Sequence, residues 1–359
     1  MGGLGQLSKL PPEILDLILD WLCLHHVHDL QVYVGERSFE PYKSPSHQHD
    51  DVRASFTGLA SLCRASKYLN QLTTWRLYHS LIEQKTNLGW ARLARTLIRR
   101  KDLAALVRHL FVEFQEKRSY HSFLPPEVNS YFAEQVALTP GVGLKADSLT
   151  RSELADTASE PAAALLTSLC PNLLTAKFAS PMDPGLPVAL GLSPPGSLAS
   201  LRDVQILHLD PEFTFDLSVY TRFFRAAPNI RLLRLLQVIC SQPLEEGLGL
   251  ENVTDLELLI SCMAGDDLAH ILRLCPNVQR LTYVCGPLYE VDQFNPREAV
   301  AMVLEHSPKI QRFELDLAAR LGYDDWDEDD MLAAKGVLER NRAVECDFRP
   351  EPDSDSDSD

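Results

Sequence analysis

The stretch Ala227-Pro228-Asn229-Ile230-Arg231-Leu232-Leu233-Arg234-Leu235-Leu236 contains the pattern that decides the fold of this chain. Pro228 ends a preceding helix, because proline disfavours helical geometry at the residue before it and lacks an N–H for the helix ladder. Asn229 then favours a turn. Ile230 is followed by apolar residues three and five positions later, which is typical of a short strand with one buried face. The segment therefore predicts a helix end, a turn and a strand in succession.

The same spacing recurs along most of the chain. Apolar residues followed by others three and five positions later occur at Val107/Leu110/Val112, Leu173/Ala176/Phe178, Val204/Leu207/Leu209, Val253/Leu256/Leu258, Val278/Leu281/Tyr283 and Ile310/Phe313/Leu315. The four strands preceded by a small residue and Pro follow predicted helices over residues 161–170, 217–226, 266–275 and 296–306. No such unit buries its apolar face alone, so we expect the units to stack into an arc. The prediction is an α/β fold with parallel strands on one side of the arc and helices on the other.

Residues 7–22 predict a helix that is apolar on more than one side. Pro11 and Pro12 are tolerated at its start, where the N–H groups lack partners in any case. One face carries Ile14, Leu15, Ile18 and Leu22, and further apolar surface comes from Leu17, Leu19 and Trp21. Such a helix must be covered on two sides. Residues 23–55 contain five His and predict a polar surface loop, before a second helical region from about Phe56 to Glu83 and another over 88–109.

Charge and composition exclude several classes of protein. Among the 359 residues, 60 are Leu, which favours helices or a leucine-spaced repeat. The net charge of −16 argues against a general nucleic-acid binder and favours a basic target region. Residues 324–359 carry fourteen acidic and four basic side chains, with a predicted helix at 329–341 and a last strand at 344–348. The end, residues 353–359, alternates Asp and Ser and predicts a disordered tail.

Cysteine usage and the absence of export signals indicate a compartment. The eight Cys form no Cys-x-x-Cys pair, and no long apolar stretch or secretory signal is visible, so we expect no membrane span and reduced thiols. These features predict a cytoplasmic or nuclear protein. In the tail, Ser354, Ser356 and Ser358 each precede Asp, which makes them phosphorylation candidates. A tail that only aids solubility is the alternative.

Candidate chemical sites are weak. The His residues between positions 25 and 49 lack Cys partners at zinc-finger spacing, so a solvated loop is favoured over a metal site. Residues 141–146 mimic a dinucleotide fingerprint but follow Thr139-Pro140 and not a strand. A basic stretch from Arg92 to Arg108 fits either a solvated helix face or a surface for an acidic partner or for the acidic tail of the chain itself. No nucleophile and base are paired, so we predict no catalysis, no cofactor and no metal.

The N-terminal segment resembles an F-box. The resemblance rests on residues 10–18, Leu-Pro-Pro-Glu-Ile-Leu-Asp-Leu-Ile, on residues 59–70 with Cys63 near the middle of a helix, and on Arg76-Leu77-Tyr78 with Leu81-Ile82. The following residues 97–110 resemble the first unit of fungal F-box proteins with degenerate leucine-rich repeats. The chain departs from the family at one point, because about 30 residues separate the first helix from the second. We expect this insertion to loop outward and to leave the helices packed.

The resemblance implies a substrate receptor of an SCF-type ubiquitin ligase. It implies a three-helix F-box over residues 8–83 with its insertion at about 23–55, an irregular leucine-rich-repeat domain over 86–348 and a tail over 349–359. A Skp-type adaptor, and through it a cullin-RING ligase, would be the partner, and the repeat arc would hold a target protein. The implied adaptor-binding residues are Leu10, Pro11, Ile14, Leu15, Ile18, Leu59, Leu62 and Cys63. Two alternatives stay open: these residues form the core of the helices, or the chain is a leucine-rich scaffold without ligase assembly.

Overall fold

The computed structural model describes residues 10–23, 46–81, 87–113, 165–180, 193–208, 214–240, 247–261, 265–285, 295–316, 332–337 and 345–349, together with residues 130, 134, 190 and 191, with few exceptions inside these ranges. The side chains of 46–53, 87–91 and 345–349 are not placed. The phosphorylation candidates Ser354, Ser356 and Ser358, residues 24–45 of the predicted loop and the motif at 141–146 lie outside the described residues.

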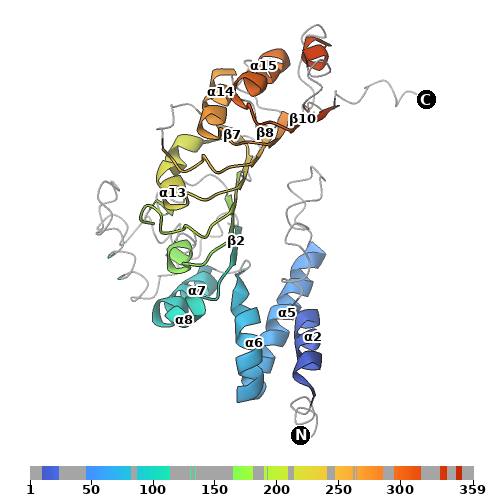
Figure 1. Ribbon diagram of the computed structural model, residues 1–359. Helices are drawn as coiled ribbons and strands as arrows, with labels where there is room; N and C mark the ends of the chain where they lie inside the picture. Colours follow the sequence, from blue (N-terminus) through green and yellow to red (C-terminus); the bar gives the residue numbers. More distant parts are fainter. Residues whose placement is uncertain are drawn as a thin grey trace, which may run out of the picture.

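A parallel sheet forms the centre of the described structure (Figure 1). Its strands follow one another in sequence order: β1 (Ser80–Leu81), β2 (His109–Glu113), β3 (Thr175–Ser180), β4 (Asp203–His208), β6 (Leu232–Leu236), β8 (Asp255–Ser261), β9 (Arg280–Cys285), β10 (Arg312–Asp316) and β11 (Glu345–Arg349). A second parallel pair joins β5 (Phe215–Asp216) to β7 (Val238–Ile239). The predicted α/β class with parallel strands is therefore confirmed.

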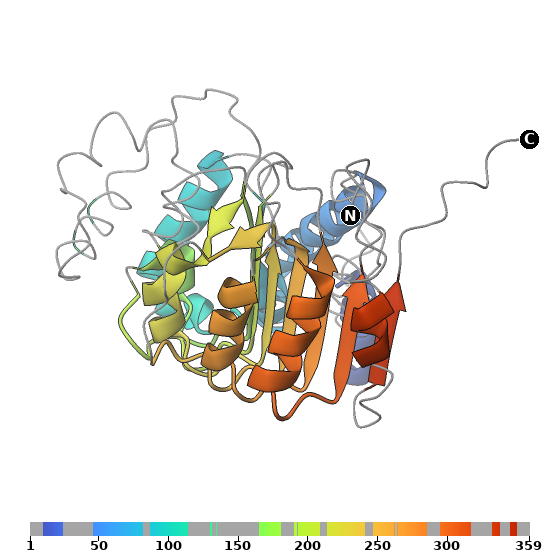
Figure 2. The same cartoon turned by 90° about the horizontal axis from the view of Figure 1, so that it is seen from above.

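Helices cover one face of this sheet. They are α7 (Asn87–Arg99), α8 (Lys101–Ala104), the 3-10 helix η1 (Leu217–Tyr220), α13 (Thr221–Ala226), α14 (Gly265–Leu274) and α15 (Pro296–His306). Figure 2 shows α13, α14 and α15 side by side in front of the strands. Residues 165–169 and 332–337 are also helical, within two further predicted helices. One hydrophobic core runs between the two layers from Leu97 of α7 to Leu315 of β10.

The predicted spacing locates the buried strand residues in all but one unit. Leu233 and Leu235 of β6 are fully buried, as are the equivalent Leu256 and Leu258 of β8. The third unit is the exception, because the predicted set Val204/Leu207/Leu209 is wrong by three positions. Val204 pairs with Leu233 and Ile206 with Leu235, so the equivalent set is Leu201/Val204/Ile206. The Pro-Asn signal is absent there, since Ala199-Ser200 replaces it. No turn signal therefore marks the residue at which that unit begins.

Asparagine side chains connect the starts of neighbouring units. The Nδ2 atoms of Asn172, Asn229 and Asn252 donate to the carbonyl oxygens of Ala105, Ala199 and Pro228 at 2.9 Å each, and that of Asn277 donates to the Glu251 carbonyl at 2.5 Å. Each acceptor belongs to the preceding unit. There it comes one position before the residue that aligns with the donor Asn. These Asn residues therefore do more than favour a turn, because each one fixes the register of its unit against the one before.

Three further helices precede β1, and their bounds correct the sequence prediction. They are α2 (Pro12–Leu22), α5 (Ser46–Ala65) and α6 (Lys67–His79). The single helical region from Phe56 is divided at Ser66, whose hydroxyl caps α6 by accepting from the Leu69 N–H at 3.1 Å. The predicted loop at 23–55 is partly wrong, since α5 begins ten residues earlier, at Ser46. Its first turns are polar, so hydrophobic spacing could not reveal them. The predicted helix 88–109 ends at Ala104, with a break at Arg100.

The asparagine bonds predict a measurable stability effect. Replacing Asn172→Ala removes the bond to Ala105 and should lower the free energy of unfolding by about 1 kcal/mol, the usual net value of such a bond. Urea unfolding would show this as a lower midpoint with an unchanged slope.

Ser200→Ala is the matched control, because Ser200 occupies the same position in its unit without a side-chain hydrogen bond to any described residue. We expect it to change the free energy of unfolding by less than about 0.5 kcal/mol. Equal effects of the two substitutions would contradict the register role of Asn172.

Candidate functional site

Helix α2 carries two separate apolar stripes. Leu15, Leu19 and Cys23, spaced four residues apart, have exposed fractions of 2%, 1% and 0% and face inward. Ile14, Leu17 and Trp21 have exposed fractions of 43%, 60% and 85%. Their spacing places these three residues on one face of α2, and the half-buried Leu10 lies two residues before the helix begins. We call Leu10, Ile14, Leu17 and Trp21 the outer stripe.

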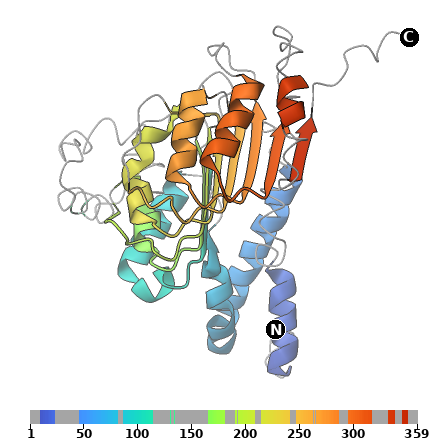
Figure 3. The same cartoon turned by 45° about the horizontal axis from the view of Figure 1, so that its top comes forward.

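The inner stripe attaches α2 to α5 and α6. Leu19 and Cys23 form a small hydrophobic cluster with Leu59 of α5, and the partly buried Leu62, Leu72 and Leu77 pack against it. The Ser55 hydroxyl of α5 donates to the Leu22 carbonyl at the end of α2. This cluster is separate from the core of the sheet. The three helices thus pack as a unit of their own, which joins the sheet where α6 leads into β1 (Figure 3).

A buried arginine also holds α2 in place. The Arg76 side chain of α6 is 4% exposed, and its guanidinium donates to Asp20 of α2 from Nε at 2.9 Å and from Nη2 at 2.7 Å. Nη2 lies 3.3 Å from the Asp16 carboxylate, and the guanidinium carbon lies 4.3 Å from the centre of the Trp75 ring. Two carboxylates therefore neutralise one buried cation, so α2 is fixed in rotation as well as in position.

The structure separates the predicted contact residues into surface and core. Pro11 and Ile14 are exposed, while Leu10, Ile18, Leu62 and Cys63 are half-buried. Leu15 and Leu59, with exposed fractions of 2% and 0%, belong to the core of the helices and are not surface residues in this structure. Their apolar character alone could not distinguish the two roles, because α2 is apolar on both sides.

The most exposed apolar residues of α2 were not among the predicted contacts. The sequence identifies Leu17 and Trp21 only as additional apolar surface, yet their exposed fractions are larger than that of Ile14. On α6, Tyr68 and Trp75 are also exposed, at 39% and 36%. The signal in the sequence was the second i, i+3, i+7 series at 14, 17 and 21. A helix that buries one stripe in its own core and exposes another has a face suited to a partner.

Cys63 differs from the other described thiols. Burial raises the pKa of the Cys63 thiol, with a hydrogen bond to Thr74 acting in the opposite direction, but the residue keeps partial exposure. Burial raises the pKa values of Cys170 and Cys275 to about 12. Among the thiols whose side chains are placed, the remaining three, Cys23, Cys240 and Cys285, are also buried.

The described residues supply no obvious metal site. They contain no group of three or more His, Cys, Asp or Glu side chains arranged to hold an ion. Within the same residues, no helix has both the length and the apolar character needed to cross a membrane.

Comparison with known proteins assigns no family. The chain matches no protein-family model, and no curated protein resembles it closely enough to count as a match. The F-box resemblance consequently rests on the residues quoted above.

The arginine between α2 and α6 provides a test of how α2 is held. Arg76→Met should lower the stability of α2 by about 2 kcal/mol, because charge-assisted hydrogen bonds to two carboxylates are lost. Hydrogen exchange of the α2 amides should become faster, while the amides of β6 and β8 keep their protection.

Asp16→Asn serves as the control, since the Asp16 side chain is 52% exposed and makes the longer 3.3 Å contact. It should cost less than about 1 kcal/mol. Unchanged exchange of α2 in the Arg76 variant would show that the hydrophobic cluster alone holds the helix.

Thiol labelling provides an independent check of burial. Near pH 8, N-ethylmaleimide should modify Cys63 at least about tenfold faster than Cys170 or Cys275, because the reactive thiolate is scarce where burial raises the pKa. Peptide mass spectrometry would assign the labelled sites. Comparable labelling rates at the three positions would contradict the burial described here.

Proposed function

We propose that the chain is a substrate receptor of an SCF-type ubiquitin ligase. In this proposal α2, α5 and α6 form the three-helix F-box within residues 8–83. The units over residues 86–348 form an irregular leucine-rich-repeat domain that presents a target protein. A Skp-type adaptor binds the F-box and connects it to a cullin-RING ligase, in the cytoplasm or nucleus.

The outer stripe carries the proposal. An apolar helix face with anchors three or four residues apart is the arrangement with which a helix enters a hydrophobic groove. Trp21 at 85% and Leu17 at 60% have the largest exposed fractions among the described large apolar residues, and they lie on the same helix. The tryptophan is also the residue type that most often dominates binding energy at interfaces. The Leu10-Pro11 opening lies at the start of the same stripe.

The arrangement of the helical unit and the sheet supports separate roles for the two. The helical unit has its own hydrophobic cluster, and β1 follows α6 directly. A partner bound to α2 therefore has a short, fixed connection to the sheet. The outer stripe would serve for docking, and the strand edges and loops would serve for target recognition.

The scaffold alternative keeps a specific observation in its favour. The polar edge of the sheet described below has features of a binding site that does not involve α2. A repeat protein without ligase assembly would use that edge alone. Adaptor binding is the property that separates the two functions.

Co-expression with a Skp-type adaptor tests the proposal. We expect the full chain and the adaptor to elute together in gel filtration. The double variant Leu17→Ser/Trp21→Ser should weaken the complex by at least about tenfold, because it removes two exposed anchors. Its fold should be unaffected, since both residues are exposed.

The control is Val219→Ser/Leu332→Ser, which changes two apolar residues of the sheet domain with exposed fractions of 50% and 59%. This variant should bind the adaptor as the wild type does. A folded wild-type chain that never elutes with the adaptor would reject the ligase role in favour of the scaffold. Equal loss in both double variants would reject the outer stripe as the docking surface.

A further inference from the structure

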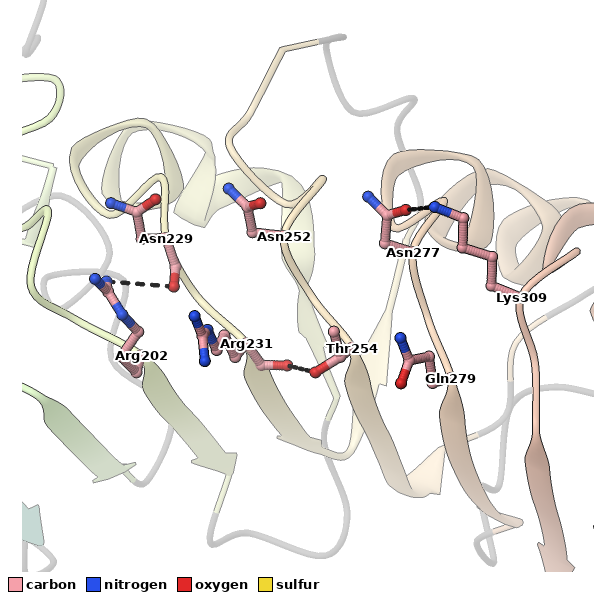
Figure 4. Close-up of a pocket in the computed structure, with 8 residues that line it drawn as sticks. All are labelled: Arg202, Asn229, Arg231, Asn252, Thr254, Asn277, Gln279 and Lys309. Carbon is pink, nitrogen blue, oxygen red and sulfur yellow. Dashed lines mark hydrogen bonds between the residues drawn. The ribbon is translucent and has the colours of Figure 1, made fainter.

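A pocket lies along the edge of the sheet where the strands begin (Figure 4). Its volume is about 330 Å³, and it is lined by Arg202, Asn229, Arg231, Asn252, Thr254, Asn277, Gln279 and Lys309. We call it the strand-start pocket. Its residues come from the turns that precede β4, β6, β8, β9 and β10, so the repeat itself aligns them in a row. The pocket is on the sheet and not on the helices α2, α5 and α6.

The charge of the pocket is opposite to that of the chain. Three of the eight lining residues are cationic and none is acidic, although the whole chain carries −16. The acidic residues nearest in the units are Glu251, which precedes Asn252, and Asp203 and Asp255, which open β4 and β8. Asp255 is ion-paired with Arg280 and accepts a hydrogen bond from the Thr254 hydroxyl at 2.7 Å. The lining itself therefore favours an anionic ligand.

The cations lie at both ends of the row. Arg202 is oriented by its Nη1 atom, which donates to the carbonyl oxygens of Ala199 at 2.7 Å and of Leu201 at 3.0 Å. Arg231 is exposed and has no carboxylate partner among the described residues. Lys309 donates to the Oδ1 atom of Asn277. Arg202 interacts electrostatically with the neighbouring Asp203, whereas Arg231 and Lys309 form no ion pair with a carboxylate of the described residues.

The middle of the row offers both acceptors and donors. The Asn229 and Asn252 amides use their Nδ2 atoms within the sheet, and Figure 4 shows their oxygens turned toward the next unit. The Gln279 amide has no hydrogen-bond partner among the described residues. A simple anion such as phosphate needs only donors, whereas an extended peptide has both N–H and C=O groups to satisfy. The mixture therefore fits a peptide better than an inorganic ion.

The length of the row sets the spacing of the ligand charges. Arg231 precedes β6 and Lys309 precedes β10, three strand intervals away, which corresponds to about 14 Å. An extended peptide rises about 3.4 Å per residue, so acidic residues about four positions apart reach both ends.

We propose that the strand-start pocket binds an acidic peptide segment of another protein in extended conformation, with carboxylates at Arg202/Arg231 and at Lys309. This proposal is independent of the ligase role, because it needs neither the adaptor nor the outer stripe. The net charge of the whole chain favours a basic target region, but the local charge of this pocket favours an acidic segment.

Fluorescence anisotropy with the full chain tests the proposal. The probe is a labelled peptide with an Asp pair at each end of a Gly-Ser-Gly spacer, and the comparison peptide has Asn in place of Asp. We expect salt-sensitive binding of the Asp peptide only. Arg231→Glu and Lys309→Glu should each weaken it about tenfold or more, because each change replaces an attraction by a repulsion.

Arg273→Glu is the matched control, since Arg273 is exposed on α14 and the change in net charge is the same. It should leave peptide binding within about twofold of the wild type, because Arg273 does not line the strand-start pocket. Circular dichroism and thermal unfolding would verify that all variants are folded.

Two outcomes would overturn the proposal. The first is that the wild type does not bind the probe, or that Arg273→Glu weakens binding as much as Arg231→Glu does. The second uses a full-length variant in which Asp353, Asp355, Asp357 and Asp359 are changed to Asn. Binding that appears only in this variant would assign the pocket to the acidic tail of the chain itself, and not to another protein.

Discussion

The backbone hydrogen bonds at the strand starts hold this sheet in register. In each unit one carbonyl accepts from two successive N–H groups of the next unit: the Arg231 carbonyl accepts from Thr254 and Asp255, and the Thr254 carbonyl accepts from Gln279 and Arg280. In four places an Asn side chain adds a hydrogen bond to a carbonyl oxygen that comes earlier in the preceding unit than the carbonyl used by the backbone bonds. Because the side-chain period of a strand is two, this register decides which residues enter the core and which line the opposite face. Helix packing, the buried Leu pairs and the polar row at the edge all depend on it.

The sequence predicted the sheet well because its signal was repeated. A Pro-Asn turn and apolar residues at fixed spacing located β3, β6 and β9, and the same spacing located β8 and β10, where only the Asn or only the Pro is present. The prediction failed where a local signal was missing, at Ser200, and where the first turns of a helix have a polar sequence, from Ser46 on. Both failures have the same physical origin, since spacing is informative only where burial constrains the residue type.

The candidate sites were less predictable than the fold. Spacing placed Ile14 and Leu15 together, but the rotation of α2 separates them. That rotation depends on two carboxylates of α2 and on Arg76 from α6, which is distant in the sequence. The strand-start pocket could not be located from the sequence either. Its lining residues come from five units and extend from Arg202 to Lys309 along the chain. Net charge was uninformative about it, since a row of three cations changes little in a total of −16.

The unbroken chain order of the strands has a consequence for biosynthesis. In the main sheet, each strand pairs only with the strands that come directly before and after it. The strand with which a new unit pairs has therefore already been synthesised when that unit leaves the ribosome. The helices α2, α5 and α6 emerge first and contain a hydrophobic cluster of their own. Folding can therefore proceed in the direction of translation, without any segment waiting for a distant partner. Until β11 is added, β10 is the exposed edge of the growing sheet.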